Sequence, residues 1–373
     1  MRSRTAFRMV IHDRSTTAGS LLGVVAIVFL VGQQLSILFG LLNYMSVLVD
    51  HSGADAWIMS KNVRNSDAGN LISVRYIDRL IGLKEVEWAE PVLIGNGLFR
   101  TRDGSYESVR VVGSRRPRFA GGPWRFAQAD ERVLLDLETV TVDRLDLSKL
   151  GNPGLEEITE IGQRRVRLRA VTDGARGFQG TIVFASLEKV REIARLPAGS
   201  ASAILVRFSE HSDTTDALNK LRAILPYCSV FSTTELSRLT RMYYFTNTGI
   251  GGSFGFSTVI AVLIGIVIIS LTMYTSVLSR TRDFAVMRAI GARKRDIAVV
   301  VFSQVLVITG IGLFLGFLML ATLLKTTGRS SIPSYFPDYV PPMLAFGTLV
   351  VSLLGSIIAL RTALRADPAA VFH

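Results

Sequence analysis

Four long stretches without a charged residue constrain the fold of this chain more than any other feature of its sequence. One lies near the N-terminus, between Arg14 and Asp50, and the others cover residues 254–278, 297–324 and 343–360. The hydrocarbon core of a bilayer needs about 20 apolar helical residues, so each stretch is long enough to cross it. Helices buried in a soluble protein rarely run this far without a charge. We therefore predict four membrane-spanning helices.

A cleaved signal peptide is the alternative interpretation of the first stretch, because it follows four arginines, Arg2, Arg4, Arg8 and Arg14. Its apolar run is longer than the hydrophobic region of a signal peptide. The small-residue pattern at residues 54–56 that resembles a cleavage site lies well downstream. We therefore predict an uncleaved anchor.

Lysine and arginine in the short connecting segments predict the orientation. Four arginines precede the first stretch, six basic residues lie between the second and third stretches, and Arg361 and Arg365 follow the fourth. The segment between the third and fourth stretches has only Lys325 and Arg329. Positively charged segments stay in the cytoplasm, so both termini and the 280–296 segment are predicted to be cytoplasmic. An even number of spans also places both termini on one side.

The fold class expected is a membrane protein with four transmembrane α-helices (1 + 3) and a large α/β extracytoplasmic domain inserted between helices 1 and 2. The bacterial cytoplasmic (inner) membrane is the predicted location. The expected boundaries are a cytoplasmic segment at 1–17, helix 1 with its stalk at 18–49, the extracytoplasmic domain at 50–241, helix 2 with its stalk at 242–279, a cytoplasmic coupling hairpin at 280–296, helix 3 at 297–324, an external loop at 325–340, helix 4 at 341–361 and a cytoplasmic tail at 362–373.

Charge and composition exclude several classes of function. The net charge of +12 would favour nucleic-acid binding in a soluble protein. Here most of the excess lies in the predicted cytoplasmic segments, where it favours contact with anionic lipid headgroups, and nucleic-acid binding is not expected. Cys228 is the only cysteine and the four histidines have no ligand spacing, so we predict no disulfide, metal site or cofactor.

The 50–241 region is long enough for one sizeable domain or two small ones, and its mixed pattern is that of small α/β sandwiches with helices on one face of a sheet. Helices are predicted at 72–83, 187–196 and 214–225, and strands at 87–100, 108–112, 166–171, 180–184, 203–208 and 228–232. Glycine and proline predict loops or junctions at 95–97, 117–123 and 151–154. An amphipathic helix at 235–244 either continues into the second span or ends before it.

No catalytic constellation is visible in this region, and its acidic residues Asp130, Glu131 and Asp136 are interpreted as surface residues. A membrane-anchored enzyme is therefore the weakest of the functions considered. We interpret the region as a binding or gating module.

The segment 280–296 carries the strongest local signal. Asp283 is suited to an N-cap, residues 284–290 form two helical turns, and Gly291 is suited to the position that ends a helix. The residues Phe284, Met287, Arg288 and Gly291 follow the spacing of one helix face, which is apolar and basic. A short capped helix at the cytoplasmic surface is suited to docking a cytoplasmic partner. The alternative interpretation is a basic loop without a docking role.

Residues 282–292 (RDFAVMRAIGA) with Arg295, Asp296 and Ile297 resemble the coupling-helix signature of FtsX-like ABC permeases, the macrolide-exporter (type VII) class. The ending at 363–371 and the 1 + 3 topology are similar to that family, so the resemblance covers the whole chain. Many members carry Glu where this chain has Asp283. Chain length and the segment 53–60 are closest to the cyanobacterial heterocyst-glycolipid exporter type.

The resemblance implies a permease subunit of an ABC exporter that couples ATP hydrolysis by a separate ATPase to periplasmic extrusion, or to lipid or lipoprotein extraction, by mechanotransmission. No G-x-x-x-x-G-K-[ST] motif occurs in the sequence, so the chain itself is not expected to be an enzyme. The resemblance implies two ATPases, a second permease copy and, in some systems, a periplasmic adaptor and an outer-membrane channel. The residues implied to couple to the ATPase are Asp283, Phe284, Val286, Met287, Arg288, Ala289, Ile290 and Gly291.

An FtsX-like signalling or scaffold permease, which regulates a cell-wall hydrolase or a sensor without transport, is the alternative function. No ionisable residue lies within a predicted span, which argues against an ion-coupled transporter. Three G-x-x-x-G pairs, Gly19/Gly23, Gly251/Gly255 and Gly312/Gly316, are consistent with helix–helix contacts, although glycine is also common in membrane helices generally.

Overall fold

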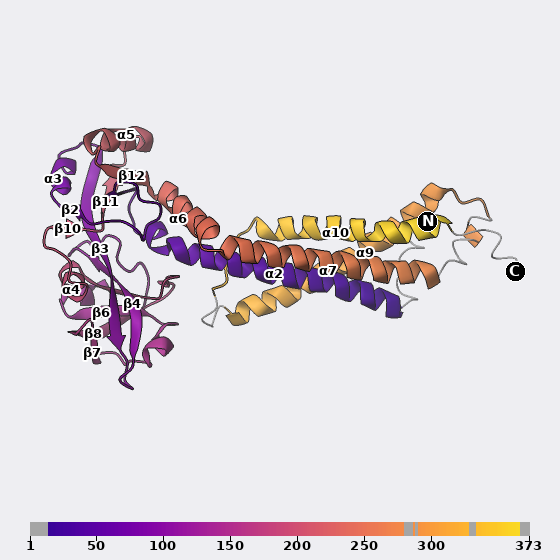
Figure 1. Cartoon of the computed structure of the whole chain (residues 1–373), viewed down its shortest axis with the longest axis horizontal. Helices are drawn as coiled ribbons and strands as arrows, with labels where there is room; N and C mark the ends of the chain where they lie inside the picture. Colours follow the sequence, from indigo (N-terminus) through magenta and orange to yellow (C-terminus); the bar gives the residue numbers. More distant parts are fainter. Residues whose placement is uncertain (1–13, 280–285, 288–289, 328–332, 366–373) are drawn as a thin grey trace. The chain divides into compact units, whose positions relative to one another are not determined.

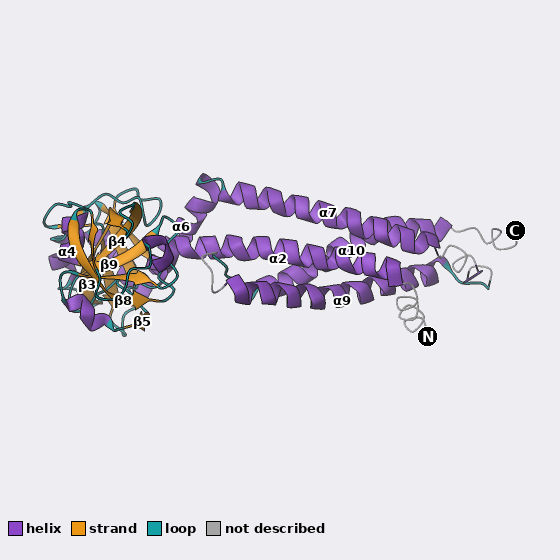
Figure 2. Cartoon of the chain, turned by 90° about the horizontal axis from the view of Figure 1, so that it is seen from below, coloured by secondary structure: helices purple, strands orange, loops and turns teal. Residues whose placement is uncertain are grey.

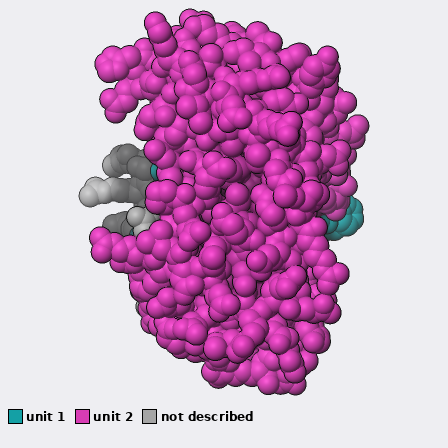
Figure 3. Space-filling view, turned by 90° about the vertical axis from the view of Figure 1, so that its left-hand side faces the viewer, with its two compact units in different colours: residues 1–40, 251–373 teal, residues 41–250 magenta. Residues whose placement is uncertain are grey.

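The computed structural model describes residues 14–279, 286–287, 290–327 and 333–365. The chain divides into two compact units, one made of residues 1–40 and 251–373 and the other of residues 41–250 (Figure 3). Three tryptophans, Trp57, Trp88 and Trp124, are the only ones in the sequence, and all lie in the second unit.

Four long helices confirm the predicted fold class of the membrane part. They are α2 (Arg14–Asp50), α7 (Ile250–Ser279), α9 (Lys294–Thr327) and α10 (Val340–Arg365), labelled in Figure 1 and drawn in purple in Figure 2. By length and composition each contains a segment that can cross a membrane. The large α/β domain lies between α2 and α7, as predicted.

We call the first unit the helical unit and the second unit the sheet unit. Glycines set the packing of α2 against its neighbours in the helical unit. A Cβ atom at Gly312 would lie 2.5 Å from Cγ1 of Val24, and one at Gly316 would lie 2.7 Å from Cβ of Val28. On the other side of α2, a Cβ at Gly23 would lie 2.7 Å from Cγ2 of Ile268 in α7. Small residues let helix backbones approach closely in a membrane, so two of the three G-x-x-x-G pairs lie at helix contacts. The third pair differs, because a Cβ at Gly255 meets nothing within 4 Å.

The substitution Gly316→Val is expected to destabilise the helical unit by about 1–3 kcal/mol, because the added methyl groups overlap Val28. Thermal stability in detergent, followed by size-exclusion chromatography of a fluorescent fusion, measures the change. Gly255→Val is the matched control, since it makes the same chemical change in open space. Equal loss of stability in both variants would contradict the packing role of Gly316.

The second unit is built on a sheet of ten strands in the order β12-β1-β11-β3-β4-β9-β6-β8-β5, with β7 paired to both β3 and β8. Neighbours are antiparallel except for the parallel pairs β4–β9 and β6–β8. The strands are β1 (Ala56–Ser60), β3 (Val86–Arg100), β4 (Tyr106–Ser114), β5 (Phe126–Gln128), β6 (Thr139–Asp143), β7 (Ile158–Ile161), β8 (Arg164–Thr172), β9 (Thr181–Ser186), β11 (Ala203–Phe208) and β12 (Cys228–Ser232). A separate ribbon pairs β2 (Ile72–Ser73) with β10 (Ser200–Ala201).

The double pairing of β7 closes part of the sheet into a ring. The strands of the ring are β3, β4, β9, β6, β8 and β7, and the residue pair Phe99–Ile161 completes it. Buried side chains of these strands, such as Leu93, Val111 and Val183, form one cluster with α4 (Leu187–Ile193). The second unit is therefore one continuous sheet that curls on itself, rather than separate small sandwiches.

Glycines in the ring contradict the loop predicted at 95–97, which lies inside β3. A Cβ at Gly95 would lie 2.5 Å from Cβ of Ala194, next to the end of α4, and a Cβ at Gly97 would lie 2.6 Å from Cγ2 of Ile161. These glycines are required by close packing inside a strand, which from sequence alone has the same appearance as a turn. The regions 117–123 and 151–154 lie between elements, as predicted.

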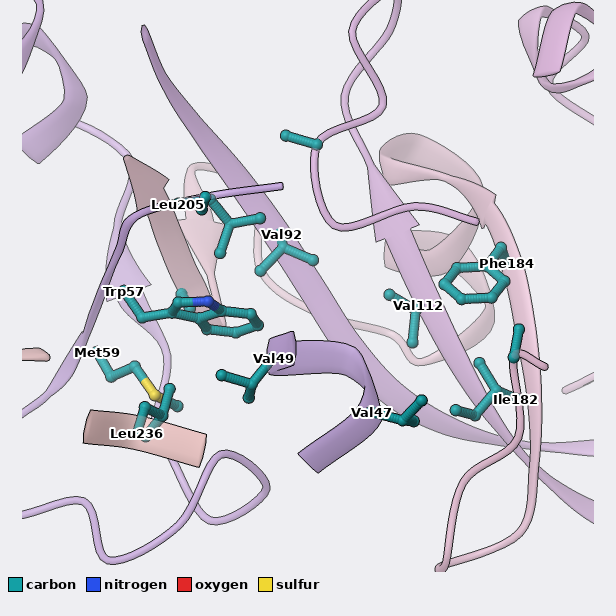
Figure 4. Packing of buried hydrophobic residues seen from close by; sticks show 14 of the residues in the cluster. Val47, Val49, Trp57, Met59, Val92, Val112, Ile182, Phe184, Leu205 and Leu236 are labelled. Atoms are coloured by element: carbon teal, nitrogen blue, oxygen red, sulfur yellow. The ribbon is translucent and has the colours of Figure 1, made fainter. Parts of the chain in front are cut away.

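Both faces of the open part of the sheet are covered. On one face, α3 (Tyr76–Leu80) and α5 (Thr214–Ile224) pack with Ala56 and Ile58 of β1 and with Ile204 of β11. On the other, the last turns of α2 and the helix α6 (Thr233–Asn247) pack on the sheet. Figure 4 shows Val47 and Val49 of α2 among the inward side chains of the strands, with Leu236 of α6 beside Met59. The prediction of helices on only one face is therefore wrong.

Most predicted elements of this unit are present, with shifted ends. The strands at 203–208 and 228–232 have the predicted bounds. The helix predicted at 72–83 is reduced to α3, because its first residues pair as β2. Two short 3-10 helices, η1 (Glu131–Leu135) and η2 (Leu147–Leu150), were not predicted.

The helix before the second span ends before that span begins. A capping box of Ser232 and Glu235 starts α6. The helix stops at Asn247, Gly249 has a φ of +75°, and α7 starts at Ile250. A left-handed glycine ends a helix, so the interpretation as one continuous helix is wrong and the short helix is present.

Candidate functional site

The predicted coupling segment ends in a helix stop with clear geometry. The Ile290 N–H donates to the Val286 carbonyl at 3.0 Å, as in a helix, and the Ala292 N–H donates to the Met287 carbonyl at 3.0 Å. Gly291 has a φ of +99°. A glycine in this conformation, followed by a residue that donates back to the last turn, is the Schellman arrangement. Gly291 therefore has the local structure that its sequence position predicts.

The next helix begins immediately after this stop. The carboxylate of Asp296 accepts a hydrogen bond from the Arg293 backbone N–H at 2.9 Å, which caps the start of α9. The helix α9, which contains the predicted third span, therefore begins within three residues of Gly291, at Lys294. Residues 290–294 are consequently a tight stop and restart rather than an extended loop.

Exposure separates the described residues of this segment into two kinds. The Ile290 side chain is 81% exposed, and Val286 is exposed as well. Met287 is half-buried and packs against the apolar cluster of the helical unit. Ile290 thus presents an apolar side chain to the surroundings, whereas Met287 faces its own unit. The predicted coupling residues Asp283, Phe284, Arg288 and Ala289 lie outside the described residues.

A closed ring of four polar side chains joins α6 to the sheet and loops of its own unit. The Arg110 guanidinium pairs with the Asp67 carboxylate at 2.7 Å and donates to Oε1 of Gln179 at 3.0 Å. The Tyr244 hydroxyl donates to the other carboxylate oxygen of Asp67 at 2.5 Å and accepts from Nε2 of Gln179 at 2.5 Å. Each side chain therefore contacts two others of the ring, which we call the Arg110 ring.

Burial makes the Arg110 ring energetically important. Arg110 is 7% exposed, although it carries a charge. Burial, with the negative charge of Asp67, raises the pKa of Tyr244, so the neutral hydroxyl persists as a donor. One turn earlier in α6, the Thr240 hydroxyl accepts from the Ser66 backbone N–H at 3.0 Å. A buried charge without its partner is costly, so these contacts hold α6 firmly against the sheet unit.

A second buried ion pair holds the end of α2. The Arg176 guanidinium donates to Asp146 at 3.1 and 3.0 Å, and both side chains are almost wholly buried. Arg176 also donates to the Tyr44 hydroxyl at 3.2 Å and lies over the Tyr44 ring. Beside this pair, burial raises the pKa of Asp143, whose carboxylate accepts from the backbone N–H groups of Leu145 and Ala175.

A third contact joins the two helices directly. Nε of Arg241 in α6 donates to the Ser46 hydroxyl at 2.7 Å, and another guanidinium nitrogen lies 2.6 Å from Asp50. Ser46 also donates to Asp50 at 2.7 Å. Together the three sets of contacts fix the last turns of α2 and one face of α6 to the sheet unit. We call these three sets of contacts the polar junction. Its charged and polar side chains bind one another, so the junction is expected to be rigid.

The sequence interpretation missed this junction. Arg110 lies in the strand predicted at 108–112, where the alternation puts it on the same face as Val112. A charged residue on a buried strand face was the available signal. Asp130 and Asp136, which were interpreted as surface residues, are exposed.

Comparison with known proteins identifies the helical part. Residues 255–368 match the family model of the FtsX-like permease C-terminal domain. This range contains α7 from its sixth residue, the helix stop at Gly291, α9 and α10. The chain therefore carries an FtsX-like permease C-terminal domain, and the resemblance predicted from residues 282–292 is confirmed. The narrower likeness to the heterocyst-glycolipid exporter type stays a prediction.

Part of the chain is also similar to curated ABC transporter permeases. Uncharacterized ABC transporter permeases of Mycobacterium tuberculosis and Mycobacterium bovis are 36% identical to this chain over 123 residues. The matched part is 31% of this chain and 33% of each relative, so the chain spans about a third of the length of the curated relatives it matches.

Two solved structures resemble about half of the chain at low similarity. The periplasmic region of MacB from Actinobacillus actinomycetemcomitans covers 50% of this chain and 93% of its own, with 13% identity and a TM-score of 0.39. The extracellular domain of the ABC-type transporter YknZ from Gram-positive bacteria covers 48% of this chain and 98% of its own, with 10% identity and a TM-score of 0.35.

Proposed function

We propose that this chain is the transmembrane permease subunit of an ABC exporter whose ATPase is a separate polypeptide. The observation that carries the proposal is the exposed helix stop around Ile290 inside the FtsX-like domain. A rigid, capped turn with an exposed apolar side chain is suited to a groove on a cytoplasmic partner. The bacterial inner membrane is its proposed location, with both termini and this segment in the cytoplasm.

The polar junction supports coupling by mechanotransmission. In this mechanism the ATPase moves the membrane helices, and the sheet unit must follow that movement. The end of α2 is held to the loop between β8 and β9 through Tyr44, α6 is held through Tyr244, and Arg241 of α6 joins the two helices through Asp50. A displacement of either helix end is therefore transmitted to the sheet unit, because buried ion pairs resist separation. Extrusion of substrate on the periplasmic side, or extraction of a lipid or lipoprotein, is the proposed outcome.

A second permease copy is part of the proposed assembly. Only 11% of the apolar window of α7 is buried within the chain, compared with 39–44% in the other three helices. Its exposed side chains include Phe256, Val259, Leu263, Val267 and Leu271, which share one helix face. Such a face is suited to a second copy in the membrane. A periplasmic adaptor and an outer-membrane channel are further proposed partners.

Affinity purification of the tagged chain from its native host in mild detergent tests the proposal. We expect an ABC-type ATPase to co-purify in stoichiometric amount, as identified by mass spectrometry. An adaptor in the same sample supports export, whereas a cell-wall hydrolase in its place supports the signalling alternative. Absence of any ATPase under these conditions would refute the coupling role of the 280–296 segment.

A further inference from the structure

A groove of about 570 Å³ lies between the end of α2 and α6, entirely within the second unit. It is lined by residues of both helices, including Leu42, Thr234, Arg238, Arg241, Met242 and Phe245. The side chains of Met242 and Phe245 are exposed. A volume of this size fits a ligand of a few hundred daltons or one chain of a larger molecule.

The groove changes from polar to apolar along its length. Thr234 and Arg238 lie toward the start of α6, whereas Met242 and Phe245 lie toward its end. In α2 the apolar lining residue Leu42 belongs to the uncharged stretch, and Asp50 is the first charge after it. The apolar end of the groove is thus formed by Leu42 in the uncharged stretch of α2 and by the end of α6 that precedes α7 in sequence.

The polar end of the groove carries an uncompensated positive charge. Arg241 is paired with Asp50, so these two charges compensate each other. The carboxylate of Glu235 is engaged by Arg222 at 2.9 Å. Arg238 is exposed, and no ion pair of Arg238 occurs among residues 14–279 or in the rest of the described chain. The first turn of α6 adds the positive end of a helix dipole beside Thr234.

We infer that this groove binds one lipid molecule with an anionic headgroup from the outer leaflet. The headgroup phosphate is held by Arg238 and Thr234, and an acyl chain lies along Leu42, Met242 and Phe245. The polarity of the groove matches that of a lipid, because its apolar end is formed by the uncharged stretch of α2 and the end of α6 that precedes α7 in sequence. This inference rests on the proposed membrane location, but it is independent of the ATPase.

Native mass spectrometry of the full-length protein tests the site. The protein is reconstituted with an equimolar mixture of phosphatidylglycerol and phosphatidylcholine and then released from the membrane mimetic. We expect one phosphatidylglycerol to be retained per chain in preference to phosphatidylcholine, because the two lipids share the phosphate but the cationic choline group offsets its attraction to Arg238. Arg238→Gln should lower this preference about fivefold, the scale of one arginine near an anionic lipid surface. Phe245→Ser should lower retention of both lipids.

Controls separate the site from general charge effects and from other occupants. Arg64→Gln removes an exposed arginine outside the groove and should leave retention unchanged. Glycerol phosphate should fail to displace the lipid, since it has a headgroup but no acyl chain. Unchanged lipid preference in Arg238→Gln, equal loss in Arg64→Gln, displacement by glycerol phosphate, or a dimer that retains no lipid would each overturn the inference. A failure to find an ATPase partner would leave these results unaffected.

Discussion

The substitution Asp67→Ala is expected to lower the unfolding free energy of the sheet unit by about 3–5 kcal/mol, because it leaves the buried Arg110 without its carboxylate partner. Tyr244 loses an acceptor in the same step. For a unit of this size the loss corresponds to a fall in melting temperature of about 10 °C. Intrinsic fluorescence measures this unit selectively, since all three tryptophans lie in it.

Two further variants make the test specific. Asp173→Ala removes a carboxylate whose partners Arg125 and Arg144 are exposed, and it should cost no more than about 1 kcal/mol. The double variant Asp67→Ala/Arg110→Met should recover part of the stability, because it removes the buried unpaired charge. If Asp67→Ala were no worse than Asp173→Ala, the Arg110 ring would not stabilise the junction.

The substitution Ile290→Glu is expected to reduce recovery of the ATPase with the permease by more than about tenfold, without loss of permease stability. A charge that replaces an apolar anchor at the centre of an interface is strongly unfavourable. The side chain is 81% exposed in the chain itself, so the substitution removes no internal packing. Quantitative pull-down measures binding, and size-exclusion chromatography of the same sample measures folding.

Ile290 is a better position for this substitution than Met287, and Ile81 provides a matched control. Met287→Glu is the substitution that the sequence favours, but Met287 packs against the helical cluster, so its effect would combine lost folding with lost binding. Ile81→Glu makes the same chemical change at an exposed position of the sheet unit and should leave ATPase recovery intact. Undiminished recovery with Ile290→Glu would contradict docking through this residue.

Hydropathy and local patterns predicted much of the architecture. The spans follow from uncharged length, since a membrane excludes charge. Strand β11 has the predicted bounds because apolar residues fill it and turns surround it. Strand β6 was missed although its threonines and valines alternate, because it has only five residues and both of its faces are buried, so the threonines do not mark a solvent-exposed face. Gly95 and Gly97 misled the prediction because their role depends on what packs against them.

The polar junction was beyond prediction from one sequence. Arg176 and Tyr44 are 132 positions apart, and Gln179 and Tyr244 are 65 apart. Their contact depends on sheet order, which local spacing does not encode. The exposed and half-buried roles of Ile290 and Met287 likewise depend on neighbouring helices. What the sequence does contain is the helix stop at Gly291, because a left-handed glycine is a local feature.

Closure of the strand ring has a consequence for aggregation. Unpaired strand edges are templates on which other chains can pair. Each of the six ring strands has a neighbour on two sides, although β3 and β7 share only the pair Phe99–Ile161, and the strands at the two ends of the sheet order are β12 and β5. Strand β12 has five residues and β5 has three. Nε of Arg222 donates a hydrogen bond to the Val230 carbonyl of β12 at 3.1 Å, so this edge acceptor already has a partner. The sheet therefore offers few sites for edge-to-edge pairing, and overproduced protein should aggregate through its apolar helices before its strands.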